Sequence, residues 1–525
     1  MGKNSAIQTY QRGKNAGGVA PDVDATLTTL AILFRRYRRK RSRSPHVLDT
    51  HSDVELLVML YLWLTQQLST LTTLEDIPDL KKIAGSQPCQ LHCLRSMRDG
   101  GVSWVEYALA YPTSTGTGTG TGTVYLWQPI PVLFNALFQP FLASISYDTP
   151  WLSRKQKQAL LQTLQKKWKT PQAFSVWPRV RKDKLFQYFT TTIQVDPVLS
   201  TTAKSVLLTT RQLHHHSAAA YQRENSDQLR FKIFHAHNAY LERLARAARA
   251  HQWHHYFDCT INGKTIALVQ APATLPPYLA EQGTIPQFYI DTRNGNRQKQ
   301  IDNPLWIGSA RHLRIEDVSV FFHRLQEAIN NNAPGKRCSL AALKTDYNLR
   351  TYQLALLCSV LTGIRPTHAI SLEKRRCFGG NTTVRDKGRF RPLWLCDYLQ
   401  QKITDYQTVQ QRLLARLPVP VESPMLWYLI DDNHQVEHLT AKTLRHFMRA
   451  YWPEDAAMAV PYQLRHFFAQ CALSSTQPQL ATHHIDRLMG HSQYGEHLGS
   501  DHLFPTCLSR IRTHLNQLPI YLHLR

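Results

Sequence analysis

Four side chains in the C-terminal part of the chain are of the types that phosphoryl-transfer chemistry needs. Arg465 follows Arg365 by 100 residues, Lys387 follows Arg365 by 22 residues, and His491 follows Arg465 by 26 residues. Two guanidinium groups suit a clamp on one phosphate, and an ammonium or imidazole group suits donation of a proton or hydrogen bond to its oxygens. These residues therefore predict a site that binds a phosphodiester and neutralises the charge that develops during its transfer.

The local sequence around each residue predicts an element that would position it. An apolar helix over 352–361 breaks at Thr-Gly-Ile-Arg-Pro, which puts the first arginine at the mouth of a turn. The stretch 382–393 predicts a β-hairpin with the lysine beside its turn. A helix that begins at Pro461 carries the second arginine, and another helix closes at Gly490, just before the histidine.

In the order and context of these motifs the chain resembles the tyrosine recombinases, also called phage integrases. That family carries Thr-Gly-Leu-Arg, a hairpin lysine, His-x-Leu-Arg-His and Leu-Gly-His, followed by a nucleophilic tyrosine. The resemblance covers roughly residues 336–525. It implies a multidomain, mainly α chain with α+β parts, whose C-terminal tyrosine-recombinase-like catalytic domain combines helices with a small β-hairpin or sheet.

The resemblance also implies a function and a role for each residue. The chain would be a DNA-binding site-specific recombinase or integrase of a mobile genetic element that exchanges strands by transesterification through a phosphotyrosine, with no metal and no other cofactor. Arg365 and Arg465 would clamp the scissile phosphate, Lys387 would protonate the leaving 5′ hydroxyl, and His491 would donate to a phosphate oxygen. Tyr462 stands where the family has the first histidine of His-x-x-Arg, and it can still donate a hydrogen bond.

The nucleophile is where the chain departs most from the family pattern. The family has its tyrosine about nine or ten residues after Gly-His, where this chain has Ser500 and Asp501. Tyr494 is the first candidate nucleophile and Tyr521 the second, and the remaining alternatives are another tyrosine and a site without a nucleophile. The alternative function is accordingly a catalytically inactive, recombinase-derived DNA-binding protein or an accessory protein of an integration system.

The charge of the chain predicts a polyanionic partner. The 62 Lys and Arg residues outnumber the 37 Asp and Glu residues, for a formal charge of +25. We expect double-stranded DNA, bound by a homo-oligomer that assembles on it, with or without further recombinase subunits. An RNA-binding or structural protein is a more distant hypothesis that rests only on the charge and on the basic N-terminal arm. The cations expected to contact DNA are Arg35, Arg36, Arg38, Arg39, Lys40, Arg41, Lys182, Lys184 and Arg389.

Composition along the chain predicts the first two of four regions, and the resemblance implies the other two. Residues 1–50 are expected to be a basic flexible arm, and residues 51–150 an N-terminal α/β region of unknown role. Residues 151–335 are expected to be a helical DNA-binding region like the core-binding domain of the recombinases, followed by the catalytic domain over 336–525. We also expect helices over 51–68, 226–252 and 315–331, strands over 103–111 and 124–132 that flank a Gly/Thr-rich loop over 113–123, and a hairpin at Asn262-Gly263.

Several alternatives are disfavoured by the sequence. No apolar run approaches the length of a membrane span, and the N-terminus carries no secretory signal, so we expect a cytoplasmic protein that acts on DNA without a membrane partner. The nine scattered cysteines suit reduced thiols. His251, His255 and Cys259 have the spacing of one helix face, but a hairpin begins there, so a zinc site is not expected.

Overall fold

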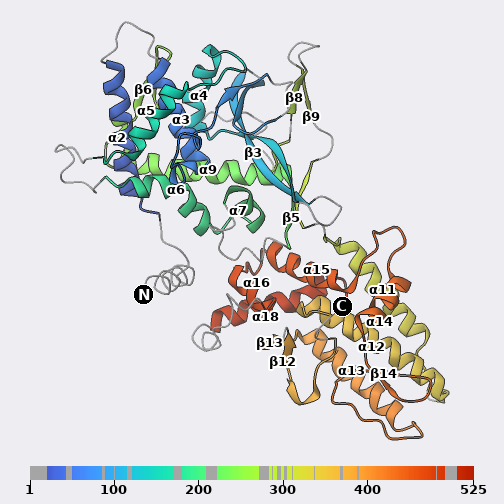
Figure 1. Ribbon diagram of the computed structural model, residues 1–525. Coiled ribbons are helices and arrows are strands. Elements are labelled where there is room, and N and C mark those ends of the chain that lie inside the picture. The colour runs from blue at the N-terminus through green and yellow to red at the C-terminus, as the bar shows by residue number, and fades with distance from the viewer. Residues whose placement is uncertain are drawn as a thin grey trace. The chain divides into compact units, whose positions relative to one another are not determined.

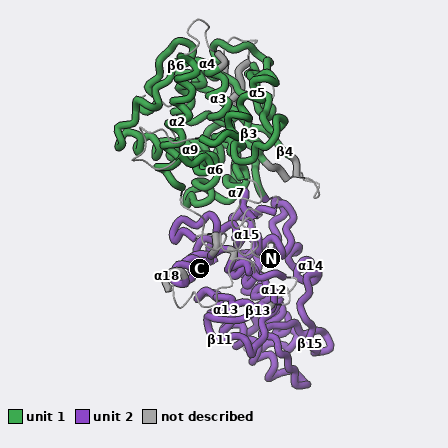
Figure 2. Tube along the Cα trace, turned by 60° about the vertical axis from the view of Figure 1, so that its left-hand side comes forward, with its two compact units in different colours: residues 1–214, 224–308 green, residues 215–223, 309–525 purple. Residues whose placement is uncertain are grey.

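The chain folds into two compact units, which are described separately. Their architecture comes from a computed structural model that describes residues 21–42, 50–84, 89–99, 101–114, 121–168, 180–208, 221–270, 283–286, 288–291, 297–300, 304–309, 311–335, 337–366, 370–386, 389–480, 482–490 and 505–524. Unit 1 comprises residues 1–214 and 224–308, and unit 2 comprises residues 215–223 and 309–525 (Figure 2). Unit 1 continues past residue 150, because helices after residue 151 share one apolar core with the preceding sheet. Unit 2 begins before residue 335, because residues 315–331 pack into the same core as the residues that follow them.

A four-stranded sheet organises unit 1 (Figure 1). Its strands follow the order of the chain, with β1 parallel to β2 and the later pairs antiparallel. Helix α4 packs on β2 and β3, and α9 contacts β4. The elements of this unit are α2 (Val23–Ser42), α3 (Thr50–Leu64), η1 (Gln67–Ser69), β1 (Lys81–Lys82), β2 (Cys93–Asp99), β3 (Val102–Ser114), β4 (Thr121–Pro129), α4 (Val132–Ser144), α5 (Arg154–Gln165), α6 (Lys182–Val195), α7 (Thr201–Leu207), α9 (Ser226–Ala250), η3 (His254–Tyr256), β6 (Asp258–Ile261), β7 (Lys264–Ala267), β8 (Phe288–Asp291) and β9 (Arg297–Gln300). The short strands β5 (Arg223–Asn225) and β10 (Trp306–Gly308) pair where the chain passes between the units.

The predicted flexible arm is wrong for residues 23–42, which form helix α2. Leu27, Leu30, Phe34 and Tyr37 recur at helical spacing and are buried in the core of unit 1. Burial of this apolar face outweighs the self-repulsion of the basic run that follows it, so the helix continues to Ser42.

The Gly/Thr-rich segment is shorter as a loop than the sequence predicts. β3 continues to Ser114 and β4 begins at Thr121, because the threonines extend the antiparallel ladder, with Thr113 opposite Gly122. β4 also ends at Pro129, and α4 begins at Val132, so the predicted strand over 124–132 is three residues too long. Residues 115–120 lie outside the described residues.

The predicted long helix and the hairpin after it are confirmed in unit 1. α9 covers Ser226–Ala250, and β6 and β7 pair around Asn262-Gly263. Because α9 ends before His251, the i, i+4, i+8 spacing with Cys259 does not describe one helix face. In the part of the chain that the structure describes, no group of three or more His, Cys, Asp or Glu side chains could hold a metal ion.

Unit 2 is mostly helical with a small sheet, as the predicted fold class requires (Figure 1). β11, β12 and β13 form an antiparallel sheet in chain order, and β14 pairs with β15. The elements are α11 (Ile315–Asn331), α12 (Leu340–Thr362), η5 (Lys374–Arg376), β11 (Cys377–Phe378), β12 (Asn381–Asp386), β13 (Arg389–Trp394), α13 (Asp397–Leu414), β14 (Leu429–Ile430), β15 (Val436–Glu437), α14 (Ala441–Tyr451), α15 (Pro461–Ser474), α16 (Thr482–Leu488) and α18 (Pro505–Tyr521). Among the described helices of both units, none is both long and apolar enough to cross a membrane.

Helix α12 is the centre of unit 2. It contacts α11, α13, α14, α15 and α18, and every residue from Leu354 to Thr362 is buried. This all-round burial is the pattern of a core helix. The helix ends where the arginine motif begins, so a helix buried in the core of the unit positions that motif.

Among the residues that the structure describes, two histidines are buried with neither ring nitrogen hydrogen-bonded, one in each unit. These are His237 on α9 and His514 on α18. Burial lowers the pKa of His237 to about 3 and that of His514 to about 4, from an ordinary value of 6.5. Below pH 6.5 these two histidines take up protons in the unfolded chain, whereas burial keeps them neutral in the folded chain. The free energy of unfolding is therefore highest above pH 6.5 and decreases as the pH falls below that value.

We expect each of these histidines to lower the free energy of unfolding by about 2 kcal/mol between pH 7 and pH 5. The reason is that pH 5 lies about 1.5 pH units below the ordinary histidine pKa of 6.5, and each pH unit is worth about 1.4 kcal/mol. His237→Phe and His514→Leu should each reduce the acid loss by that amount in urea unfolding at the two pH values. His323→Phe, at an exposed position of α11, is the matched control. An acid loss that stays the same in all three variants would contradict this assignment.

Candidate functional site

The turn after α12 requires glycine. Gly363 has a φ of +65°, and a Cβ there would lie 2.4 Å from the Phe468 ring and 3.2 Å from Met489 Sδ. Any other residue would therefore be strained in its backbone and would collide with α15. The turn brings Arg365 to the end of β12.

Asp386, the last residue of β12, forms ion pairs with two arginine side chains. Arg365 Nη1 forms an ion pair with Asp386 Oδ1, and Arg391 Nε donates to Asp386 Oδ2 at 3.2 Å. Burial raises the pKa of Asp386, but the hydrogen bond from Arg365 and the charges of Arg391, Arg365 and Arg465 outweigh it, so this pKa is below its ordinary value. Asp386 is therefore a carboxylate at neutral pH.

Arg391 joins the hairpin to the end of α16. Its Nη1 donates to the Leu488 carbonyl at 3.0 Å. Gly490 has a φ of +63°, and a Cβ there would lie 2.3 Å from Arg391 Cδ. The glycine of the Gly-His motif thus leaves the space that this arginine occupies. Burial, and then the charge of Arg465, lowers the pKa of Arg391 to about 10, so it stays cationic at neutral pH.

Arg465 on α15 is fully buried and connects the turn at Gly363 with the turn at Gly490. Its Nη1 donates to the Gly363 carbonyl, and its Nη2 donates to the Met489 carbonyl at 2.5 Å. Burial lowers its pKa, the charge of Arg365 lowers it further, and Tyr221 opposes both. The second predicted arginine therefore links the turn after α12 to the turn after α16 by donating a hydrogen bond to each.

The three arginines and Asp386 form what we call the arginine cluster: Arg365, Asp386, Arg391 and Arg465. Three guanidinium groups face one carboxylate, which leaves two positive charges uncompensated within the cluster. Arg391 Nη2 and Arg465 Nε are buried without a hydrogen-bond partner. Buried cations and buried donors are costly when unpaired. The cluster therefore has the chemistry of an anion site.

A group of aromatic rings lies beside the second arginine. The His466 ring is 4.6 Å from the Tyr221 ring and 5.3 Å from the Tyr462 ring, measured between centroids. The Arg311 guanidinium lies 5.6 Å from the Tyr462 ring centroid. Burial, with the charges of Arg311 and Arg465, lowers the pKa of His466 to about 4. His466 is therefore neutral at pH 7, next to a site that is already rich in cations.

The predicted catalytic residues fall into four groups. Arg365 and Arg465 meet in the arginine cluster, whereas Tyr462 lies on the first turn of α15 in the ring group. Tyr521, the second candidate nucleophile, is at the end of α18, 45% exposed, and its hydroxyl lies 3.4 Å from Gln517 Oε1. The remaining predicted residues lie outside the described residues: Lys387, His491 and Tyr494.

The cations predicted to bind DNA from unit 1 mostly have partners within that unit. Arg36 lies 5.4 Å from the Trp168 ring centroid, and Arg38 donates to the His255 carbonyl at 2.8 Å. The other contacts are the ion pairs Lys40–Glu55 at 2.5 Å and Arg41–Asp53 at 2.7 Å, and the donation from Lys182 Nζ to the Leu164 carbonyl at 2.5 Å. Arg35 and Arg39 lie on α2, and Lys184 lies on α6. Arg389 is the first residue of β13 in unit 2. Contact of this set with DNA stays a prediction.

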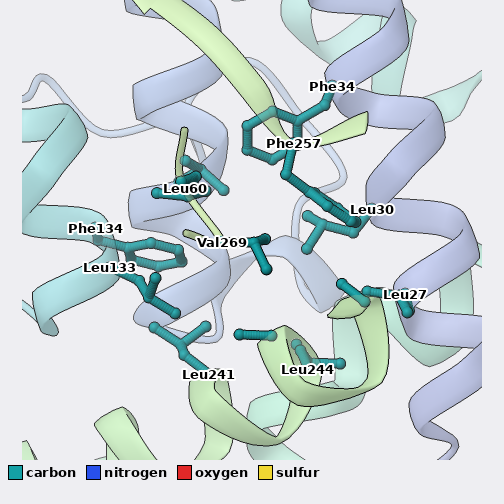
Figure 3. Close-up of a pocket in the computed structure, with 13 residues that line it drawn as sticks. Leu27, Leu30, Phe34, Leu60, Leu133, Phe134, Leu241, Leu244, Phe257 and Val269 are labelled. Carbon is teal, nitrogen blue, oxygen red and sulfur yellow. The ribbon is translucent and has the colours of Figure 1, made fainter. Parts of the chain in front are cut away.

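An apolar pocket in unit 1 lies between α2, α3, α4 and α9 (Figure 3). Its lining includes Leu30, Phe34, Phe134, Leu241 and Phe257, and none of its lining residues is polar. Its volume is about 30 Å³, which is far below that of a ligand site. We assign it to imperfect packing of the core rather than to function.

Comparison with known proteins identifies no family. No family model matches the chain, and no curated protein matches it. Among solved structures, the XerH site-specific recombinase bound to difH substrate, a pre-cleavage complex, is similar at 15% sequence identity with a TM-score of 0.25. The match covers 39% of this chain and 50% of that one, so this chain spans about half the length of that protein. A TM-score this low does not establish a common fold.

Proposed function

We propose that the chain is a DNA-binding site-specific recombinase or integrase that exchanges strands through a phosphotyrosine intermediate. The observation that carries the proposal is the meeting of Arg365 and Arg465, which are 100 residues apart in the sequence, in one buried cluster with two uncompensated positive charges. The phosphodiester of DNA is an anion that both guanidinium groups suit. The excess of 25 positive charges over the chain supports a nucleic-acid partner.

The proposed chemistry needs only groups from the chain and the DNA. A tyrosine oxygen, from Tyr494 or Tyr521, attacks phosphorus and gives its proton to solvent water, while the bond from phosphorus to the 5′ oxygen breaks. Lys387 gives the leaving oxygen its proton, and His491 donates to a non-bridging oxygen. The arginine cluster stabilises the charge on the transferring phosphate. A second 5′ hydroxyl then attacks the phosphotyrosine and releases the tyrosine.

The proposal includes the partners and the location predicted above. Double-stranded DNA is the substrate, and several protomers of this chain, or this chain with further recombinase subunits, assemble on it. The protein then acts on DNA in the cytoplasm, as one component of the movement of a genetic element.

A second function has its own support in the cluster. Both Nη atoms of Arg465 donate to backbone carbonyls, and Arg365 is held by Asp386. These bonds serve the fold of unit 2 whether or not DNA is cleaved. An inactive, recombinase-derived DNA-binding protein would keep them for stability, and it would form no covalent bond to DNA.

Covalent trapping separates the two functions. The full chain is incubated with duplex DNA from the borders of the element that encodes it, nicked beside each candidate crossover so that the cleaved end diffuses away. A recombinase leaves a protein–DNA band on a denaturing gel, and peptide mapping identifies the linked tyrosine. Tight duplex binding without such a band would mean that the chain is a DNA-binding protein and not a recombinase.

A further inference from the structure

The three-stranded sheet of unit 2 has two unlike faces. In antiparallel pairs, directly opposite residues share a face. Asp386 and Arg391 are therefore on the face that packs into the unit, together with the buried Val384 and Leu393. The other face, which we call the outer face, carries Phe378, Asn381, Arg385 and Phe390.

The outer face exposes two large aromatic side chains. Phe378 is 74% exposed and Phe390 is 50% exposed. They lie on the edge strands β11 and β13, on either side of β12, opposite Asn381 and Arg385 respectively. Two phenylalanines exposed on one small sheet form an apolar surface that is unfavourable in water unless a partner uses it.

Positive charge surrounds these rings. Lys374, Arg375 and Arg376 form the short helix η5 that leads into β11, and Arg385 is exposed between the strands. The Arg376 guanidinium lies 3.9 Å from the Phe390 ring centroid, and the Arg375 side chain is 77% exposed. Glu373 pairs with Arg375 and Arg376, which leaves this group strongly positive. Aromatic rings interleaved with cations suit a ligand that has both flat faces and negative charge.

A polar pocket continues the outer face at its base. Asn381 borders it, and so does Trp394, the residue opposite Asn381 on β13. Its volume is about 260 Å³, and its other walls include Asp397, Gln400 and Arg512. The amide, carboxylate and guanidinium groups match the hydrogen-bonding edges of nucleobases. The volume suits a group smaller than a typical drug-sized ligand, such as a single base.

We infer that the outer face binds unpaired DNA. Bases that are not adjacent in the strand stack on Phe390 and on Phe378, the phosphates lie along Arg375, Arg376 and Arg385, and the polar pocket takes one base. A base pair inside a duplex covers its own faces, so only an unpaired strand can stack on these rings. The inference goes beyond the proposed strand exchange, because the arginine cluster belongs to the opposite face of the sheet and is not needed for it.

The test compares single-stranded and duplex DNA on the full chain. Fluorescence anisotropy measures binding of a labelled oligothymidylate and of a labelled hairpin duplex. The double variant F378A/F390A should bind oligothymidylate at least about tenfold more weakly, since each stacked base contributes on the order of a fivefold or larger factor. Its affinity for the duplex should change by less than about threefold.

Two matched variants make the result specific. F378W/F390W keeps the stacking surfaces and should bind the oligothymidylate within about threefold of the unchanged chain. V419A/M458A removes two exposed apolar side chains elsewhere in unit 2 and should have no effect. Because all four positions are exposed, circular dichroism should show the same melting curve for every variant.

Three outcomes would overturn the inference. Unchanged oligothymidylate binding by F378A/F390A would remove the rings from the interface. An equal loss for the duplex would make the face a general DNA surface. If poly-glutamate competed as well as oligothymidylate, and with the same dependence on the two rings, the face would belong to an acidic protein. None of these results depends on strand cleavage, so they are distinct from a failure of the proposed function.

Discussion

Arg465→Ala is expected to reduce covalent complex formation by about a thousandfold, the upper end of the effect of removing one donor that stabilises a transition-state charge. Its guanidinium lies in the arginine cluster and carries a buried nitrogen without a partner. Affinity for duplex DNA should change by less than about tenfold, because binding is spread over many phosphate contacts. Gel trapping and a filter-binding titration measure the two quantities on the same protein.

Arg465 also holds the fold together, so a second variant is needed. Alanine leaves the carbonyls of Gly363 and Met489 without their donor. Arg465→Lys keeps the charge but lacks the planar fork that reaches both carbonyls, and it should still lower trapping strongly. Arg510→Ala, at an exposed position on α18, is the control. Normal trapping by a folded Arg465→Lys protein would show that the arginine is structural alone.

Gly363→Ala is expected to destabilise unit 2 by about 2 to 5 kcal/mol. Part of this cost is the left-handed backbone, which disfavours an L residue by roughly 1–2 kcal/mol. The rest is overpacking, because the new methyl group would lie 2.4 Å from the Phe468 ring in the core, and such insertions cost about 1–3 kcal/mol. Urea unfolding measures the loss.

Gly379→Ala separates the two contributions. This glycine also has a positive φ, +57°, but nothing lies within 4 Å of its added Cβ. It should cost only the backbone part, about 1–2 kcal/mol. Equal losses for the two variants would mean that the turn after α12 is not packed as tightly against α15 as described.

The elements that carry the arginine motifs follow from local signals in the sequence. Gly363 ends α12 in the left-handed conformation, as the Thr-Gly break predicts. Pro461 begins α15, where the missing amide hydrogen costs nothing, and α11 covers the predicted 315–331. The hairpin strands β12 and β13 flank the predicted turn. Because these signals act over a few residues, the sequence alone is enough to place them.

The composition of the cluster could not be predicted in the same way. Asp386 and Arg391 are absent from the predicted site because their pairing depends on the register of β12 on β13, and a slip of one strand by one residue would put them on opposite faces of the sheet. Alternation along β12 is the signal that could have found them, since Thr382 and Val384 share the buried face with Asp386. His466 needed the fold as well, because Tyr221 reaches it from outside the C-terminal segment of unit 2.

The N-terminal segment shows how distant contacts override local charge. The run from Arg35 to Arg41 has the composition of a solvated arm. Its partners are far away in the sequence: Arg38 meets His255, and Arg41 and Tyr37 both bond the Thr260 carbonyl. The local run of charge predicts an arm because it does not show contacts over more than 200 residues, whereas the apolar spacing from Leu27 to Tyr37 is the local signal that indicates a helix.

The most direct test of the arginine cluster is an experimental structure of the full chain bound to nicked duplex DNA. We expect one phosphate of the DNA within hydrogen-bonding distance of Arg391 Nη2 and Arg465 Nε, the two buried nitrogens that have no partner. Arg365 should contact the same phosphate while it keeps its ion pair with Asp386. If the DNA bound elsewhere and no phosphate contacted the arginine cluster, the result would contradict both the role of the cluster as an anion site and the proposed strand exchange.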